Sequence, residues 1–300
     1  MKYQRVTTHL AETMSKLDVD KAMRDDYAKC ILADPQILAD IVKVIVPEFR
    51  EYSIKDIIPC IGETIVSLTV PEKLCIKIES DGTEDIDIED GKIIYDIRFP
   101  LYYNNRTIKI LVNVEAQKSI SYTKLGYHIE SRMVYYMARL VSSQKNVEFI
   151  KSNYDDIKDV YSIWICMDTE ADEDSIIELG LQPRVIYGNT SWLPQRSIMD
   201  GAVIRIRSRA DVEESKNKLI AMLEVLFSCR ARQDKMNRLE EYGLEMTTEL
   251  EGCVNDMCNI SDLLVEESEE RGEKQARLDS IRTLMRKLNQ TAEEAMDTLD

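Results

Sequence analysis

Two stretches of β-type residues in the middle of the chain predict a pair of neighbouring strands. They are Ile93–Tyr102 and Thr107–Glu115, and a short polar turn separates them. Each stretch carries one carboxylate among apolar neighbours, Asp96 in the first and Glu115 in the second. A carboxylate inside an apolar strand is costly unless a partner or a metal ion compensates for it. Antiparallel pairing of the two strands would bring both carboxylates to one end of a hairpin or to one edge of a sheet.

Apolar residues at helical spacing predict helices on both sides of this pair. Asp34 followed by Pro35 is typical of a helix start, and the apolar positions from Ile37 to Val46 then form one buried face. A longer helix is expected from Thr123 to Ser143. One residue away from its apolar face runs a basic and aromatic stripe, which consists of Lys124, His128, Arg132, Tyr135 and Arg139. Such a stripe is usually a solvated face, but its place directly after the strand of Glu115 favours a surface that faces phosphate or carboxylate groups.

The second half of the chain predicts the centre of a sheet and then further helices. The almost continuous apolar run Asp159–Met167 is typical of a strand that is buried on both faces of a mixed sheet. Residues 168–200 are expected to be loops, residues 202–207 a last strand, and residues from 233 onward helical throughout. Trp164 is expected in the core and Trp192 packed beneath its own loop.

Charge and cysteine content limit the possible environments of the protein. The net charge is −16, and residues 240–300 carry 17 acidic against 6 basic side chains. This balance does not predict strong, sequence-independent binding to DNA. The seven cysteines are scattered and include no CxxC pair, which predicts reduced thiols in a cytoplasm. The chain shows no apolar leader at its start and no apolar run of membrane length, so we expect a soluble protein with no membrane association. Two histidines are too few for a histidine-rich zinc site.

Two strand carboxylates with a backbone carbonyl nearby suit Mg²⁺, with Mn²⁺ as an alternative. A water polarised by such an ion can attack a phosphodiester, while the ion neutralises charge on the phosphate oxygens. Glu115 and Gln117 are two residues apart on a strand and therefore point to the same face, whereas Lys118 points to the other. The residues alone favour an ordinary strand-edge aspartate at position 96, paired with Arg98 or Arg106, over a metal ligand.

Four segments resemble the PD-(D/E)XK nuclease superfamily, in particular the branch called PD-(D/E)XK nuclease family transposase, which is related to recombination-promoting nucleases. They are YDIRF (Tyr95–Phe99), LVNVEAQKS (Leu111–Ser119), GYHIESRMVYYMARLVSSQ (Gly126–Gln144) and NYDDIKDVYSIWICM (Asn153–Met167). The resemblance implies a restriction-endonuclease-like α/β core, a mixed sheet flanked by helices, over residues 61–232. An N-terminal helical segment (residues 1–60) and an acidic helical C-terminal extension (residues 233–300) would flank this core.

The same resemblance implies a metal-dependent DNA endonuclease that hydrolyses phosphodiester bonds and is associated with transposition or recombination. Asp96 matches the first acid of the motif, Glu115 the second, and Gln117 stands where the superfamily has lysine. A neutral amide positions groups only by hydrogen bonds, so Arg132 or Lys124 would have to supply the missing positive charge. The implied catalytic residues are Asp96, Glu115, Gln117, Arg132 and Tyr135, and the implied metal ligands are Asp96, Glu115, the backbone of Ala116, and Glu63 from the preceding segment.

Two other functions stay open at this point. A catalytically weak relative would act as a protein-interaction module, with the C-terminal helices joining copies of the chain into a homo-oligomer. An unrelated hydrolase with two carboxylates, such as a glycosidase, would need an aromatic sugar platform, and the chain has only two tryptophans.

Overall fold

The computed structural model describes the chain in segments. These are residues 23, 25–67, 84–87, 91–103, 108–168, 173–193, 197–206, 215–228, 231–258, 281–283 and 291. The chain divides into two compact units, one of Met1–Arg24 with Asp256–Asp300 and one of Asp25–Asn255. In the first unit, residues 281–283 are helical, and most of the acidic C-terminal extension lies outside the described residues. The three-part division of the chain and an oligomer through its C-terminal helices therefore stay predictions.

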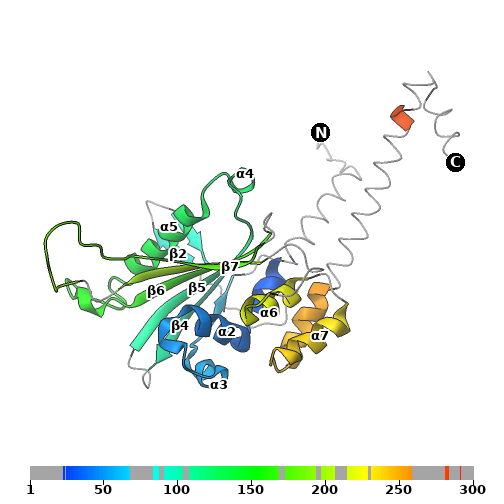
Figure 1. Cartoon of the computed structure of the whole chain (residues 1–300), viewed down its shortest axis with the longest axis horizontal. Helices are drawn as coiled ribbons and strands as arrows, with labels where there is room; N and C mark the ends of the chain where they lie inside the picture. Colours follow the sequence, from blue (N-terminus) through cyan, green and yellow to red (C-terminus); the bar gives the residue numbers. More distant parts are fainter. Residues whose placement is uncertain are drawn as a thin grey trace, which may run out of the picture. The chain divides into compact units, whose positions relative to one another are not determined.

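A six-stranded mixed sheet is the centre of the second unit (Figure 1). Its strands lie in the order β1-β4-β5-β6-β8-β7, and β2 and β3 form a separate two-stranded sheet. The bounds of the strands are Ile65–Val66 (β1), Glu84–Asp87 (β2), Gly91–Ile94 (β3), Ile97–Tyr103 (β4), Ile108–Ser119 (β5), Asp159–Asp168 (β6), Ser175–Gly180 (β7) and Met199–Arg205 (β8).

β5 and β6 lie in the middle of the sheet, which contains both antiparallel and parallel strand pairs. β4 and β5 are antiparallel, whereas β5, β6 and β8 run parallel to one another. The side chains of β6 are buried from Val160 to Cys166, which confirms the strand predicted from the apolar run. β7 pairs antiparallel with β8 at one edge, inside a stretch that the sequence had suggested to be loops.

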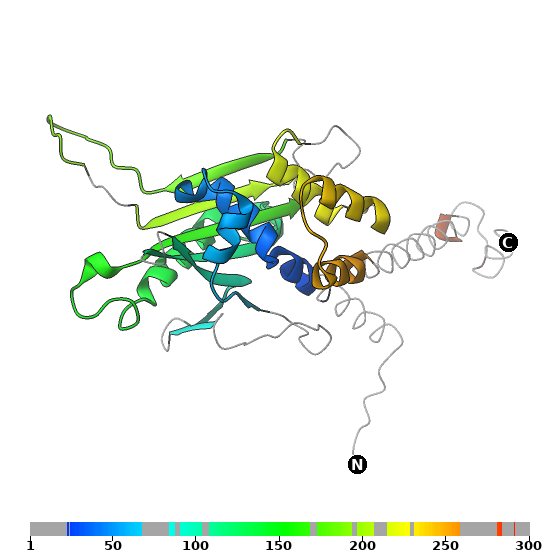
Figure 2. The same cartoon turned by 90° about the horizontal axis from the view of Figure 1, so that it is seen from below.

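Helices cover both faces of the sheet (Figures 1 and 2). The chain is therefore an α/β protein with a mixed sheet flanked by helices. α5 lies on one face, and α2 and α6 lie on the other. The helices are α2 (Pro35–Ile45), α3 (Ile54–Ile57), α4 (Tyr122–Leu125), α5 (Ile129–Ser142), α6 (Lys218–Phe227) and α7 (Arg232–Glu241), with short 3-10 turns at Pro47–Phe49, Ile58–Cys60 and Tyr154–Asp156.

Local signals define the predicted N-terminal helix. The side chain of Asp34 accepts a hydrogen bond from the backbone N–H of Gln36 at 2.8 Å, and Pro35 occupies the first helical position. This cap satisfies an N–H group that has no partner within the helix. The apolar positions of α2 are buried, as their spacing predicts. Residues 25–32, directly before α2, are also helical.

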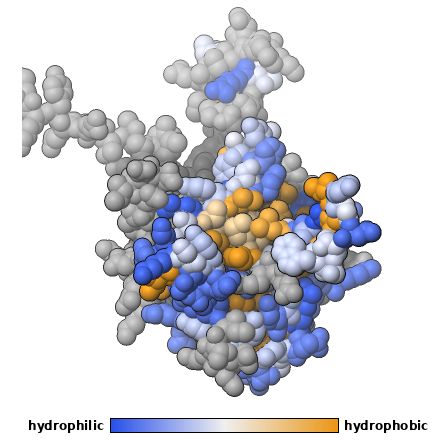
Figure 3. Space-filling model, turned by 90° about the vertical axis from the view of Figure 1, so that its left-hand side faces the viewer, coloured by the Kyte–Doolittle hydropathy of each residue, from blue (hydrophilic) through white to orange (hydrophobic). Residues whose placement is uncertain are grey.

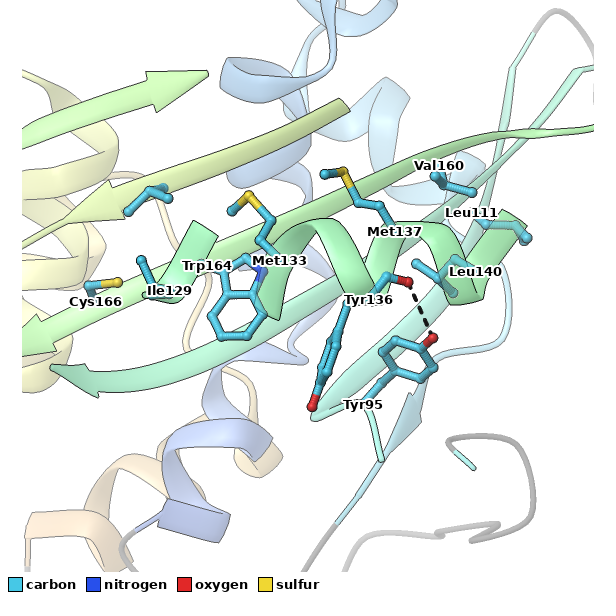
Figure 4. Close-up of a cluster of buried hydrophobic side chains, with 11 residues drawn as sticks. Tyr95, Leu111, Ile129, Met133, Tyr136, Met137, Leu140, Val160, Trp164 and Cys166 are labelled. Atoms are coloured by element: carbon cyan, nitrogen blue, oxygen red, sulfur yellow. Dashed lines mark hydrogen bonds between the residues drawn. The ribbon is translucent and has the colours of Figure 1, made fainter. Parts of the chain in front are cut away.

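The core beneath α5 is rich in large side chains (Figure 4). The ring of Tyr136 lies 5.3 Å from that of Tyr95 and 5.5 Å from that of Trp164, measured between ring centroids. Trp164 is completely buried, as predicted, and its indole N–H donates to the hydroxyl of Ser162 at 2.9 Å. This cluster fixes α5 against β5 and β6, and so determines which residues of α5 reach Glu115. The cluster consists of Tyr95, Leu111, Ile129, Met133, Tyr136, Met137, Leu140, Val160, Trp164, Cys166 and Val203.

Three predicted elements are interrupted in the structure. The helix expected over Thr123–Ser143 is wrong as one piece, because Gly126 has a φ of +77° and ends α4. The helical run expected from residue 233 onward is likewise broken after α7, where Gly243 has a φ of +91°. The first predicted strand is divided between β3 and β4 by a bend at Asp96.

Residues 181–193 form an arm that leads from β7 toward β8 and projects from the sheet (Figures 1 and 2). Ile186 is 88% exposed, Tyr187 96% and Trp192 74%. The prediction that Trp192 packs beneath its own loop is therefore wrong. Apolar side chains are also visible on the surface of this end of the molecule (Figure 3). In the part of the chain that the structure describes, no helix is long and apolar enough to cross a membrane.

Candidate functional site

Asp96 and Glu115 lie opposite each other at the start of the β4–β5 pair. Ile97 pairs with Val114, so continuing the antiparallel register by one residue places Asp96 against Glu115. The backbone N–H of Asp96 donates to Oε1 of Glu115 at 3.2 Å, and the backbone N–H of Ala116 donates to Oδ2 of Asp96 at 3.0 Å. These reciprocal bonds hold the two carboxylates side by side.

Glu115 is an acidic side chain in an apolar setting. It is 2% exposed, and the side-chain amide of Asn113 donates a second hydrogen bond to its Oε1 at 3.2 Å. Burial raises the pKa of Glu115 well above its usual range, the negative charge of Asp96 raises that pKa further, and the positive charge of Arg132 opposes both effects. The amide oxygen of Asn113 is buried and has no hydrogen-bond partner within the described part of the chain. The surroundings of Glu115 therefore favour a bound proton or a bound cation.

Asp96 forms an ion pair with a lysine side chain that the sequence patterns had not indicated. Nζ of Lys29 lies 3.1 Å from Oδ1 of Asp96 and 3.1 Å from Oδ2 of Asp25. Lys29 belongs to the helical residues 25–32, and its side chain is 9% exposed. Burial raises the pKa of Asp96, while Lys29 and the N–H of Ala116 act in the opposite direction. The helix before α2 thus adds one lysine and one further carboxylate to the site.

Arg132 approaches Glu115 from α5. Its guanidinium donates to the hydroxyl of Tyr127 at 2.8 Å and to the hydroxyl of Tyr136 at 2.6 Å, and it lies 5.1 Å from the ring centroid of Trp164. A guanidinium over an aromatic face is attracted by the ring quadrupole. These contacts fix the position from which the charge of Arg132 acts on Glu115. Arg132 therefore acts on Glu115 through its charge, while its hydrogen bonds go to the two tyrosines.

The structure brings some of the predicted site residues together and leaves others apart. Ala116 lies at the site through its N–H, and Gln117 is half-buried on β5, on the same face as Glu115 and level with Cys166. Tyr135 is 44% exposed, and its neighbour Tyr136 contacts Arg132 in its place. Successive helical residues point about 100° apart, so only one of the two tyrosines can face the sheet.

Glu63 is not brought to the carboxylates. The N–H of Gly62 donates to the carbonyl of Pro100, which places Glu63 near Pro100. Pro100 lies four residues beyond Asp96 along β4, a distance of about 13 Å at roughly 3.3 Å per residue. Glu63 is also exposed. Asp25 is the additional acid that the structure places near Asp96.

The donor atoms at the site fit a small, oxygen-preferring cation. Among the described residues, no group of three or more His, Cys, Asp or Glu side chains is placed to hold a metal ion. Mg²⁺ is nevertheless commonly held by one or two carboxylates and otherwise by water. Among the residues that the structure describes, each oxygen of Asp96 makes one contact and retains a further lone pair. Asp96 and Glu115 would hold such an ion, and the free amide oxygen of Asn113 could accept a hydrogen bond from a water on it.

Local patterns could not have revealed all of these residues. Asp25 and Lys29 are spaced by four residues on a predicted helix, a pattern that usually indicates only a solvated ion pair. Comparisons with protein-family models, curated proteins and solved structures find no match to this chain. A function is therefore inferred from the residues of the site and from their geometry.

Proposed function

We propose that the protein is a metal-dependent DNA endonuclease of the PD-(D/E)XK type, which hydrolyses phosphodiester bonds. The observation that carries the proposal is the convergence of Asp96 and Glu115 through reciprocal hydrogen bonds. The proposal is also supported by the α/β fold with its mixed sheet, by the antiparallel pairing that brings the two acids together, and by the helix that follows them. An association with transposition or recombination rests on the sequence resemblance alone.

The chain's own residues would position the reactants. A divalent ion at the carboxylates would lower the pKa of a bound water and neutralise charge on the phosphate. Asp96 and Glu115 are held in place by backbone N–H groups, so little reorganisation is needed at the moment of reaction. The water oxygen forms a bond to phosphorus, one P–O ester bond breaks, and the water's proton is transferred to solvent or to the leaving oxygen. Gln117 can orient the water through its amide.

DNA as the substrate has to be reconciled with a net charge of −16. Residues 240–300 contribute −11 of this charge, so the rest of the chain is only moderately acidic. Lys29 contacts Asp96 and the charge of Arg132 acts on Glu115, so these two cations offset part of the negative charge of the site. We therefore expect binding to depend on the metal and on the local site, with a weak contribution from sequence-independent attraction.

Asp96→Asn is expected to abolish cleavage of DNA without unfolding the protein. Asparagine has the same shape, but its amide is neutral and replaces one of the two oxygens by an NH₂ group. Loss of metal assistance is worth several kcal/mol, or roughly a 10³-fold decrease in rate. The measurement is nicking of supercoiled plasmid in Mg²⁺ and in Mn²⁺, with circular dichroism to establish that the variant is folded.

Glu63→Gln provides the matched control for this substitution. It removes one carboxylate from an exposed position that is remote from Asp96, so cleavage should be unchanged. Nicking by the original protein that persists in EDTA, or nicking that survives Asp96→Asn, would contradict the proposal. A loss of nicking in Glu63→Gln would show that the site is wrongly placed.

The projecting arm favours a second function, that of a protein-interaction module. Exposed apolar side chains in a contiguous group are typical of protein interfaces. Leu181, Ile186, Tyr187 and Trp192 are all more than half exposed on this arm. Residues 179–199 contain no acidic side chain, in a chain that is acidic as a whole. A second copy of the chain is the partner to test first.

Replacing Ile186, Tyr187 and Trp192 together by serine is expected to prevent self-association. The three side chains contribute little to the fold because they are exposed, so the free energy of unfolding should change by no more than about 0.5 kcal/mol per site. Light scattering should give an oligomer for the original protein and a single chain for the variant. A single chain in both cases would exclude the arm as a self-association element.

A further inference from the structure

We propose that Lys29 supplies the positive charge that the superfamily pattern places two residues after its second acid, where this chain has Gln117. The inference rests on the proposed nuclease function and deepens it by naming the residue that orients Asp96 and places a charged N–H donor beside the substrate phosphodiester. The observation behind it is the position of Nζ of Lys29, 3.1 Å from Oδ1 of Asp96.

The basic residues that the sequence had suggested for this role are placed differently. The guanidinium of Arg132 is held by the hydroxyls of Tyr127 and Tyr136 and lies over an indole ring. Lys124 is exposed on α4, which the break at Gly126 separates from α5. Lys29, by contrast, directly contacts one of the two acids on which the proposed chemistry depends.

The position of Lys29 is built into the fold. Its side chain is only 9% exposed, and a buried charge is costly unless opposite charges compensate for it. Asp25, one helical turn earlier, and Asp96 provide this compensation at equal distances of 3.1 Å. Burial alone would lower the pKa of Lys29, but Asp96 and Asp25 outweigh burial and raise the pKa above its usual value. The role assigned to Lys29 is that of a fixed charge, and it includes no proton transfer.

Lys29 also completes the immobilisation of Asp96. One carboxylate oxygen contacts Lys29 and the other accepts a hydrogen bond from the N–H of Ala116, so both oxygens of the carboxylate are held in place. An ammonium has three N–H groups, and the two carboxylates account for two of them. The third remains for a non-bridging oxygen of a phosphodiester, which would have to reach Nζ through the 9% of the side chain that is exposed. A lysine from the N-terminal helix can therefore supply the positive charge that a lysine at position 117 would supply from β5.

The first test is the variant Lys29→Met, which keeps the length of the side chain and removes its charge. Loss of a preorganised charged donor lowers a catalytic rate on the order of 100-fold or more. We expect this loss in the rate of plasmid nicking at saturating Mg²⁺. The rise in melting temperature that Mg²⁺ or Mn²⁺ alone produces should be retained, because both carboxylates remain. Lys109→Met is the matched control. Lys109 lies on β5, six residues before Glu115, and forms an ion pair with Glu148.

The decisive test moves the charge to the position of the motif lysine. The double variant Lys29→Met, Gln117→Lys should regain nicking activity by roughly tenfold or more over Lys29→Met, because a lysine on β5 would lie on the same face as Glu115. A purely structural role of Lys29 would not respond to this relocation. Lys29→Gln serves as a second neutral variant if the methionine variant does not fold.

The possible outcomes separate this inference from the proposed function. If the original protein does not nick DNA with either metal, the nuclease proposal fails and this inference fails with it. If the original protein is active and Lys29→Met is equally active, only the role of Lys29 is excluded. The role is also excluded if Lys29→Met loses the metal-induced rise in melting temperature, or if Gln117→Lys restores nothing. Loss of nicking, retained metal binding and recovery by Gln117→Lys together would support it.

Discussion

Glu115→Gln is expected to lower metal-dependent cleavage roughly 10³-fold and at the same time to make the protein more stable at neutral and alkaline pH. The buried carboxylate is one of the two proposed metal ligands, so its loss removes the ion. Without the ion, ionised Glu115 is a buried charge beside Asp96, and the neutral amide of glutamine avoids this cost. Activity and stability therefore change in opposite directions at one residue.

The pH dependence of this effect follows from the raised pKa of Glu115. Between the ordinary pKa of a glutamate and the raised value, the folded protein binds a proton that the unfolded chain has released. The stability contributed by this proton is complete at low pH and is lost as the pH rises through that interval, by up to about 1.4 kcal/mol per pH unit. Glutamine does not titrate, so the difference in stability between the variant and the original protein should grow with pH.

Urea unfolding of both proteins in EDTA, from pH 5 to pH 8, measures this difference. Other groups titrate in the same range, but they are common to both proteins and cancel in the comparison. Adding Mg²⁺ at pH 8 should then stabilise the original protein and leave Glu115→Gln unchanged. Glu63→Gln should follow the original protein throughout. A difference in stability that does not vary with pH would show that Glu115 holds no unusual proton.

The pairing of Asp96 with Glu115 could be predicted because it depends on local patterns. Residues of β type on both sides of a polar turn indicated two neighbouring strands, and each strand carried one acid. The same holds for the buried strand β6 and for the cap of α2 at Asp34. In these cases the deciding side chains lie within one element or within two strands joined by a short turn.

Lys29 and Tyr136 could not be predicted because their roles depend on packing between distant segments. Lys29 precedes Asp96 by 67 residues, and nothing in its neighbourhood shows which strand its helix will meet. The choice between Tyr135 and Tyr136 depends on how α5 is rotated over the sheet, which the cluster around Trp164 decides. Gly126 was a visible signal for the end of α4, although a single glycine inside a helical pattern does not by itself require a break.

Trp164→Ala is expected to cost about 3–5 kcal/mol of the free energy of unfolding, whereas Trp192→Ala should cost no more than about 0.5 kcal/mol. Trp164 is fully buried on β6 beneath α5 and contacts the ring of Tyr136, so alanine leaves a cavity under the helix. Trp192 undergoes the same chemical change at an exposed position of the arm. Unfolding in urea, followed by circular dichroism, compares the two variants.

Trp164→Phe separates the packing of the core from the placement of Arg132. Phenylalanine fills most of the space and retains an aromatic face, but it lacks the N–H that donates to Ser162. We expect a smaller loss of stability than in Trp164→Ala, because most of the buried apolar area remains. Its cleavage rate should stay closer to that of the original protein, because Arg132 still has a ring on which to lie. Equal losses of stability in Trp164→Ala and Trp192→Ala would contradict the buried cluster around Trp164. The position of α5 depends on this cluster, and the approach of Arg132 to Glu115 depends on the position of α5.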